Sequence, residues 1–172
     1  MPSSSEIPVL LLDVDGVLNA ARVDLPDGWQ RGTYNGFVLS WDPTVTARLR
    51  KLHESGQVEI RWLTTWAENA DLMLAEPMGL PRGLTTYVHE GAASTGFLGV
   101  HRSLSGWWKL ARAAEVADAE PDRRIVWIDD DLIEQATDTE EWLAAHPNVL
   151  VVAPDLFTGL THAQLDEIEA WL

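Results

Sequence analysis

The stretch IPVLLLDVDGVLN, residues 7–19, decides the fold of this chain. Its apolar run from Pro8 to Leu12 is followed by two aspartates that flank one valine, and then by Gly16. The run is too short to cross a membrane and predicts a strand that is buried on both faces. Gly16 permits a sharp turn at the end of this strand because it has no side chain to obstruct the backbone.

Asp13 and Asp15 lie where this strand is expected to end. Residues two apart on an extended chain point to the same side and are about 6–7 Å apart at the backbone. Two like charges this close make each other harder to ionise unless a cation lies between them. The pair therefore indicates a metal site, although a DxD pair alone is equally typical of a solvated strand end. A calcium loop of the helix-loop-helix kind is excluded, because the residues after Asp15 lack its further oxygen ligands.

Length and composition predict one folded domain over residues 1–172. The chain is 46% hydrophobic and contains nine tryptophans, which is sufficient for a sizeable core. No apolar stretch approaches the roughly 20 residues that a transmembrane helix requires, and the segment MPSSSEIP lacks the basic region of a signal peptide. The sequence also has no cysteine. We therefore expect a cytoplasmic protein without disulfides and without an association with membranes.

The net charge of −15 limits the partners of the protein. It repels polyanions, with a range of about 8–10 Å at physiological salt, so unaided binding to an extended nucleic acid is not expected. A short phosphorylated end remains compatible with this charge, because a metal ion and a few cations can reverse the field at one place. The sequence does not predict the oligomeric state.

Strands and helices alternate after the first strand. Asp42 and Pro43 form a helix start signal and Gly56 a stop signal. The stretch at 58–63 predicts a second strand, with Val58, Ile60 and Trp62 on one side. Its apolar pattern is less continuous than that of the first strand, so it is expected nearer a sheet edge. The remaining expected elements are a short helical segment at 67–76, a mostly irregular stretch at 77–105 with one short strand near 85–88, a helix through 107–116 capped by Ser105, strands at 125–128 and 149–152, and helices at about 132–145 and 161–171.

Residues 20–41 contain two turn signals, Pro-Asp-Gly at 26–28 and Tyr-Asn-Gly at 34–36. They predict a hairpin or small flap inserted beside the end of the first strand. Arg22 and Arg31 lie in this insert. Each can meet a phosphate, but a solvated surface arginine is the more common role.

The alternation predicts a three-layer, Rossmann-like α/β fold with a parallel sheet. Ligands of such sheets gather at the carboxyl ends of the strands. Polar residues fall at these ends: Asp13 and Asp15 after the first strand, Thr64 and Thr65 after the second, and Asp129, Asp130 and Asp131 after the strand at 125–128. Several carboxylates without cysteine favour Mg²⁺ as the cofactor.

Phosphoryl transfer at such a site needs a hydroxyl donor and an ammonium group in addition to the metal. Thr64 and Lys109 can supply them. Each residue also has a simpler interpretation: Thr64 as a helix cap, Lys109 as a surface lysine, and the three aspartates as caps for the following helix. Their order along the chain favours the chemical interpretation.

Four motifs in this order, DVDGV at 13–17, the threonine at 64, Lys109 and IDDD at 128–131, resemble the haloacid dehalogenase-like (HAD) superfamily of aspartate-based phosphatases. The resemblance implies that Asp13 is the nucleophile that forms a phosphoaspartate and that Asp15 is the general acid and base. It also implies that Thr64 and Lys109 hold the phosphoryl group, and Thr65 is a further candidate for substrate binding. Asp130 is implied as a metal ligand, joined by the Asp13 carboxylate and the Asp15 main-chain carbonyl, with Asp129 as a further candidate.

DVDGVLN, WLTTW and the closing GLT-x-x-Q-L are similar to the HAD domain of Swiss Army Knife RNA repair proteins. This narrower resemblance implies removal of phosphate from RNA or nucleotide ends. The short gaps between the motifs leave no room for a large cap domain, so an open site is expected. Trp66 is either a core side chain or a ring that stacks on a base or sugar.

Three hypotheses follow. The first is a magnesium-dependent phosphohydrolase that acts on a phosphorylated small molecule, nucleotide or RNA end. The second is a catalytically silent relative that binds a phosphorylated ligand or protein; the presence of both Asp13 and Asp15 favours the enzyme over it. The third is an assembly domain, which exposed clustering of Trp29, Trp107 and Trp108 would favour.

Overall fold

The computed structural model describes residues 7–89, 102–103 and 106–172. Its centre is a parallel sheet of five strands in the order β5-β4-β1-β8-β9. The strands are β1 (Val9–Leu12), β4 (Glu59–Leu63), β5 (Thr86–Tyr87), β8 (Ile125–Ile128) and β9 (Val149–Val152). All four residues of β1 are completely buried, as a strand at the middle of a two-faced sheet requires. The strand at 58–63 was expected near an edge, and β4 lies next to the short edge strand β5.

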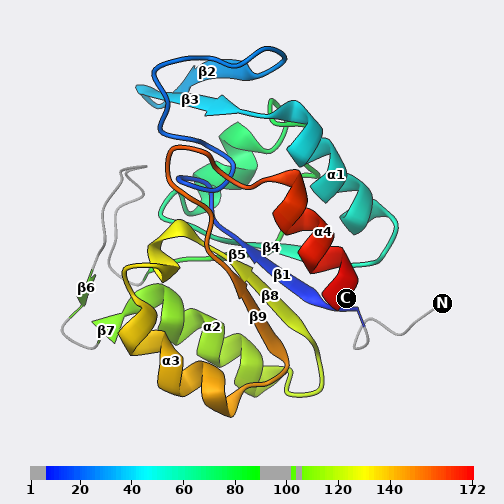
Figure 1. Cartoon of the computed structure of the whole chain (residues 1–172), viewed down its shortest axis with the longest axis vertical. Coiled ribbons are helices and arrows are strands. Elements are labelled where there is room, and N and C mark those ends of the chain that lie inside the picture. Colours follow the sequence, from blue (N-terminus) through cyan, green and yellow to red (C-terminus); the bar gives the residue numbers. More distant parts are fainter. Residues whose placement is uncertain (1–6, 90–101, 104–105) are drawn as a thin grey trace.

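Helices cover both faces of this sheet (Figure 1). Helices α1 (Pro43–Glu54) and α4 (His162–Trp171) lie on one face, and α2 (Trp108–Ala119) and α3 (Ala136–Ala145) on the other. The expected three-layer α/β fold is thus confirmed, and the described residues contain no second domain of the size of a cap. Among them, no helix is both long enough and apolar enough to span a bilayer.

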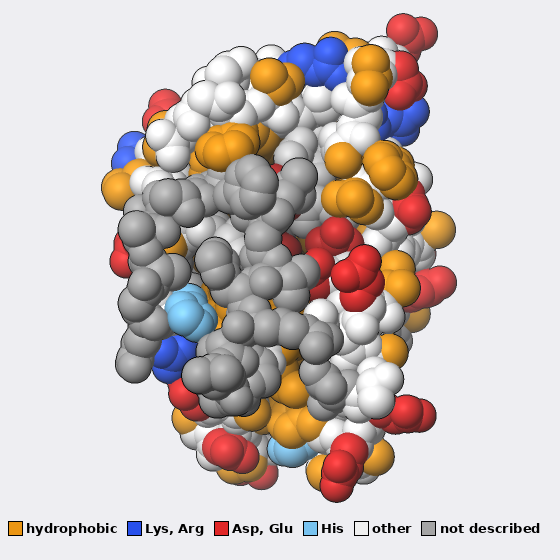
Figure 2. Space-filling model, turned by 90° about the vertical axis from the view of Figure 1, so that its left-hand side faces the viewer, with side chains coloured by type: hydrophobic (Ala, Val, Ile, Leu, Met, Phe, Trp, Pro, Cys, Tyr) orange, Lys and Arg blue, Asp and Glu red, His pale blue; other side chains and the backbone are white. Residues whose placement is uncertain are grey.

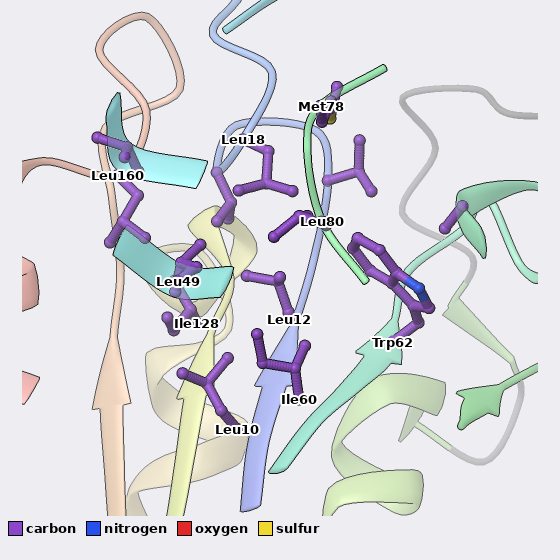
Figure 3. Close-up of a cluster of buried hydrophobic side chains, with 14 of the residues drawn as sticks. Leu10, Leu12, Leu18, Leu49, Ile60, Trp62, Met78, Leu80, Ile128 and Leu160 are labelled. Carbon is purple, nitrogen blue, oxygen red and sulfur yellow. The ribbon is translucent and has the colours of Figure 1, made fainter. Parts of the chain in front are cut away.

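The sheet divides the interior into two cores because alternate side chains of each strand point to opposite faces. Leu10 and Leu12 of β1 lie in the larger core together with Ile60 and Ile128 (Figure 3). Side chains of the other parity contribute to the smaller core beneath α2 and α3. Trp107 and Trp108 are buried in this smaller core, which removes the exposed tryptophan cluster that an assembly domain would have presented.

The ends of α1 follow the expected signals, and α4 lies where a helix was expected. Asp42 caps α1 by accepting a hydrogen bond from the Thr44 amide, and Gly56 follows the helix with φ +72°. Thr161 and Gln164 form a capping box at the start of α4.

One expected helix start was wrong, whereas α2 begins within one residue of the expected position. Helix α3 begins at Ala136 rather than near 132, because a 3₁₀ turn (Asp130–Leu132) comes first. Helix α2 has Trp107 as its N-cap, without a side-chain cap bond, and the expected cap Ser105 lies outside the described residues. The expected irregular stretch at 77–105 also falls largely outside them; its described part contains β5 and β6 (Arg102–Ser103), which pairs with β7 (Gly106–Trp107).

The predicted hairpin lies within residues 20–41. Strands β2 (Gln30–Tyr34) and β3 (Phe37–Trp41) pair antiparallel, and positive φ angles at Asn35 and Gly36 form the tight turn between them. The short helical segment expected at 67–76 is a π-helix at Ala70–Leu74.

Candidate active site

The ends of β4, β1 and β8 lie side by side and bring the predicted polar residues to one edge. Leu12 is in register with Trp62 of β4 and with Ile128 of β8. Asp13 therefore lies beside Asp129, and Thr64 follows the neighbouring strand. Strand β1 is also where the chain order of the sheet reverses, because β4 and β8 lie on its two sides. Such a reversal is the preferred ligand position in an open α/β sheet.

Figure 2 views the molecule from the side toward which β1 points in Figure 1. Acidic side chains gather at the middle of this face, with hydrophobic side chains beside them.

Lys109 extends from the first turn of α2 into this edge and connects two of its carboxylates. Its Nζ lies 2.6 Å from Asp13 Oδ2 and 2.8 Å from Asp129 Oδ2, and 3.8 Å from Asp131 Oδ2. The lysine side chain is 2% exposed. It is therefore not the surface lysine of the simpler interpretation, and its ammonium group offsets the charge of two buried acids.

Burial and charge act in opposite directions on these groups. Burial alone would lower the pKa of Lys109, but the carboxylates of Asp129 and Asp13 outweigh it and raise that pKa above its ordinary value. Burial raises the pKa of Asp129 well above its usual range, and the charge of Lys109 only partly offsets this. The lysine thus stays charged, whereas the carboxylate of Asp129 is costly to ionise without further cations.

Asp13, Asp129 and Asp130 form the group that suits a metal ion. Each offers one carboxylate oxygen, and these oxygens lie within 4.8 Å of one another. Burial, followed by the charges of Asp13 and Asp131, raises the pKa of Asp130 to about 7. These carboxylates repel one another when all are ionised, and Mg²⁺ between them would offset that repulsion. Mg²⁺ also prefers oxygen ligands, so the residues present fit this ion.

Gly16 makes room for the Asp130 carboxylate. A Cβ atom at Gly16 would lie 2.1 Å from Asp130 Cγ, and the φ angle of Gly16 is +69°. Any side chain at this position would therefore displace Asp130 and strain the backbone. Gly16 therefore allows both the sharp turn after β1 and the position of the Asp130 carboxylate in the candidate metal group.

Asp129 uses both of its carboxylate oxygens, and one of them takes the capping role that was considered from the sequence. Its Oδ2 accepts from Lys109, while its Oδ1 accepts from the Asp131 amide at 3.1 Å and so caps the 3₁₀ turn. Thr64 likewise has a local role, because its Oγ1 accepts from the Trp66 amide at 3.3 Å. Thr64 is buried, and Thr65 is half-buried in the same turn.

Asp15 is half-buried, and its carboxylate is held at both oxygens. Asn19 Nδ2 donates to Oδ1 and Trp66 Nε1 donates to Oδ2, each at 2.8 Å. Burial and the charge of Asp13 raise the pKa of Asp15, although the two hydrogen bonds and Lys109 favour its ionised form. The side chain of Asp15 is not part of the metal group, so the implied contact with a metal concerns its main-chain carbonyl.

The sequence predicted no role for Asn19, and only stacking or core packing for Trp66. Trp66 is indeed buried, at 1% exposure, but its indole nitrogen faces Asp15. The polar Asn19 within an apolar stretch, four residues after Asp15, was the available signal for the first of these contacts.

Arg22 and Arg31 take part in contacts within the hairpin region. Arg22 pairs with Asp24 at 2.7 Å and stacks on Trp29, whereas Arg31 donates to Ser40 Oγ.

A five-stranded parallel sheet, a DxD turn and a buried lysine between two strand-end aspartates are the features of a HAD-like protein. The chain belongs to the family described as HAD domain in Swiss Army Knife RNA repair proteins, whose model matches residues 9–165. No curated protein and no solved structure gives a significant match. Membership of this family supports a hydrolase of the HAD type.

Proposed function

We propose that the protein is a magnesium-dependent phosphohydrolase that acts on a phosphate monoester through an aspartyl phosphate at Asp13. The observation that carries the proposal is the geometry around Asp13. One of its oxygens meets the buried ammonium of Lys109, and the carboxylates of Asp129 and Asp130 lie within metal-binding distance of it. Mg²⁺ bound there would neutralise these carboxylates and the incoming phosphate.

In the first step, a carboxylate oxygen of Asp13 attacks the phosphorus and the bond from phosphorus to the ester oxygen breaks. The departing oxygen takes the proton of Asp15. Water then attacks the phosphorus of the aspartyl phosphate and gives its proton to Asp15, and cleavage of the bond to Asp13 releases inorganic phosphate. The raised pKa of Asp15 supports its part as the acid, because a protonated carboxyl is needed at the start.

Lys109 and Thr64 complete the site in this proposal. The ammonium group lies where it can meet an oxygen of the phosphoryl group as well as Asp13. The Thr64 hydroxyl accepts from the Trp66 amide, so its own hydrogen remains available for donation to a phosphoryl oxygen.

The test is hydrolysis of p-nitrophenyl phosphate with Mg²⁺ by the wild type and by Asp13→Asn. Asp118→Asn, the same change at an exposed position of α2, is the matched control. We expect activity in the wild type and the control, and none in Asp13→Asn or with excess EDTA. Activity that persists in Asp13→Asn contradicts the assignment of the nucleophile. Inactivity of all three proteins favours the alternative that the domain only binds a phosphorylated ligand.

The family description favours a nucleotide or RNA end as the substrate. The net charge of −15 restricts such a substrate to a short phosphorylated end rather than an extended strand. Short RNAs with a 3′-phosphate or a 5′-phosphate, compared with the corresponding mononucleotides, test this assignment. If a non-nucleotide phosphate ester is hydrolysed far better than all of them, the RNA-end assignment is wrong.

A further inference from the structure

Both hydrogen bonds to Asp15 come from residues that are themselves fixed to the β2–β3 hairpin. Asn19 donates to Asp15 with its amide nitrogen and accepts at its Oδ1 from the Ser40 amide of β3, at 2.9 Å. The Trp66 ring packs edge-on against Phe37 of β3, with centroids 5.9 Å apart. The orientation of Asp15 therefore depends on the hairpin through two separate contacts.

We propose that Asn19 and Trp66 are positioning residues that orient the Asp15 carboxylate for proton transfer, and that the hairpin holds both of them in place. This inference deepens the proposed function and rests on it. A carboxylate held at one oxygen can still rotate, whereas two donors on different oxygens fix its plane. Each oxygen has two lone pairs, so the two bonds leave positions for the proton that Asp15 must carry.

The turn that carries Trp66 has an unusual backbone. Ala67 has a φ of +48°, a left-handed conformation that costs a residue with a Cβ on the order of 1 kcal/mol. Thr64 accepts hydrogen bonds from this turn at both its carbonyl and its hydroxyl, from the amides of Ala67 and Trp66. Strain of this kind persists where the surroundings enforce it and is common at functional sites. Here one strained turn carries the proposed phosphate-holding threonine and the indole that orients the acid.

A simpler explanation is that Asp15 merely satisfies a buried indole N–H. The fold does not require such a partner for each buried indole. In the described part of the chain, the Nε1 atoms of Trp41, Trp62 and Trp127 are buried without a hydrogen-bond partner. Trp62 is also completely buried and belongs to the same core as Trp66. Trp62→Phe is therefore a matched control for Trp66→Phe, since only the second change removes a hydrogen bond.

The experiment compares kcat/KM for two substrates in the wild type, Trp66→Phe and Trp62→Phe. Phenyl phosphate needs a proton for its leaving oxygen, whereas 2,4-dinitrophenyl phosphate releases a stable anion. General acid catalysis contributes about 10²–10⁴-fold, and a misplacement of about 1 Å costs about 10²-fold. For Trp66→Phe we expect a loss of about 10- to 100-fold on phenyl phosphate and less than threefold on the dinitrophenyl ester. Trp62→Phe should affect both substrates equally and slightly.

Equal losses of Trp66→Phe on both substrates, or no loss on either, overturn the positioning role. A second measurement separates this outcome from a failure of the proposed function. The indole N–H resonance of Trp66, assigned from its loss in Trp66→Phe, should move upfield in Asp15→Leu, because the charged acceptor is removed. An unmoved resonance overturns the contact. An inactive wild type with a resonance that moves means that the contact exists but the proposed phosphatase function is wrong.

Discussion

Replacement of Lys109 by methionine tests the electrostatic reasoning at the site most directly. Methionine keeps the length and apolar character of the side chain but removes the ammonium that lies 2.6 Å from Asp13 and 2.8 Å from Asp129. Both carboxylates are almost fully buried, so each would lose its nearest positive partner without gaining water. Removal of one partner from a buried ion pair costs about 3–5 kcal/mol. We therefore expect the free energy of unfolding of Lys109→Met to fall by about that amount at pH 8 in EDTA.

The pH dependence of this loss follows from the carboxylates. The raised pKa of Lys109 means that its contribution to stability is complete below the ordinary lysine pKa and is not lost near neutral pH. Burial raises the pKa of Asp129, so the folded state binds a proton more readily than the unfolded chain does. In Lys109→Met the pKa of Asp129 should rise further, because the nearby positive charge is gone. Protonation of Asp129 then relieves its repulsion with the Asp13 carboxylate as the pH falls. The loss of stability should thus be clearly smaller at pH 5 than at pH 8.

Urea denaturation at both pH values measures these differences. Lys51, the only other lysine of the sequence, is exposed on α1, so Lys51→Met is the matched control and should change stability by less than about 0.5 kcal/mol. The double variant Lys109→Met with Asp129→Asn should recover part of the loss, because one unpaired carboxylate is removed. A loss below about 1 kcal/mol in Lys109→Met, or one independent of pH, would refute the reasoning.

Three further predictions concern the metal group and its separation from the rest of the fold. The pKa of Asp130 is about 7, so protons compete with Mg²⁺ for its carboxylate near neutral pH. Calorimetry should therefore show roughly tenfold weaker Mg²⁺ binding at pH 6 than at pH 8. Equal affinities at the two pH values would exclude Asp130 as a ligand. Gly16→Ala should weaken Mg²⁺ binding at least tenfold and destabilise the fold by about 1–3 kcal/mol, since its Cβ would overlap the Asp130 carboxylate. Arg61→Met, which breaks the ion pairs of Arg61 with Glu59 and Glu120, should destabilise the protein by about 2–3 kcal/mol in thermal or urea unfolding while leaving Mg²⁺ affinity unchanged.

The strands at the middle of the sheet could be predicted closely because they are buried on both faces. A continuous apolar run such as Ile125–Ile128 has no other stable environment in a chain of this kind, and it ends where the first aspartate begins. The start of α3 could not be predicted in the same way. Its position depends on Asp129, whose carboxylate caps a 3₁₀ turn while it also accepts from Lys109. Local sequence rules do not include a partner 20 residues away.

The same limit explains which parts of the candidate site were missed. The order of the motifs predicted which strand ends meet at the candidate site, because the carboxyl ends of parallel strands share one edge. It did not indicate which atom of Trp66 faces the site, since that depends on a contact with Asp15 across 51 positions of sequence. Burial of Trp66 was the correct expectation, but burial and a polar function are compatible for indole, which has an apolar ring and one donor. A tryptophan beside a catalytic motif therefore needs both interpretations.

Under the proposed function, the charges at the site require that a cation accompany the phosphate that binds there. Five carboxylates, those of Asp13, Asp15, Asp129, Asp130 and Asp131, share this edge with the ammonium of Lys109. The pKa values of the last four carboxylates are all raised, with burial as the largest cause and Asp13 as a common contributor. A phosphate ester adds further negative charge at an edge where the ionisation of these carboxylates is already unfavourable. Lysine alone does not reverse this excess, whereas a divalent cation together with a proton on Asp15 would reduce it on both sides of Asp13, the proposed nucleophile. Under the proposed function, the acidic site would therefore make phosphate binding conditional on the metal, and it would repel polyanions that approach without engaging the metal.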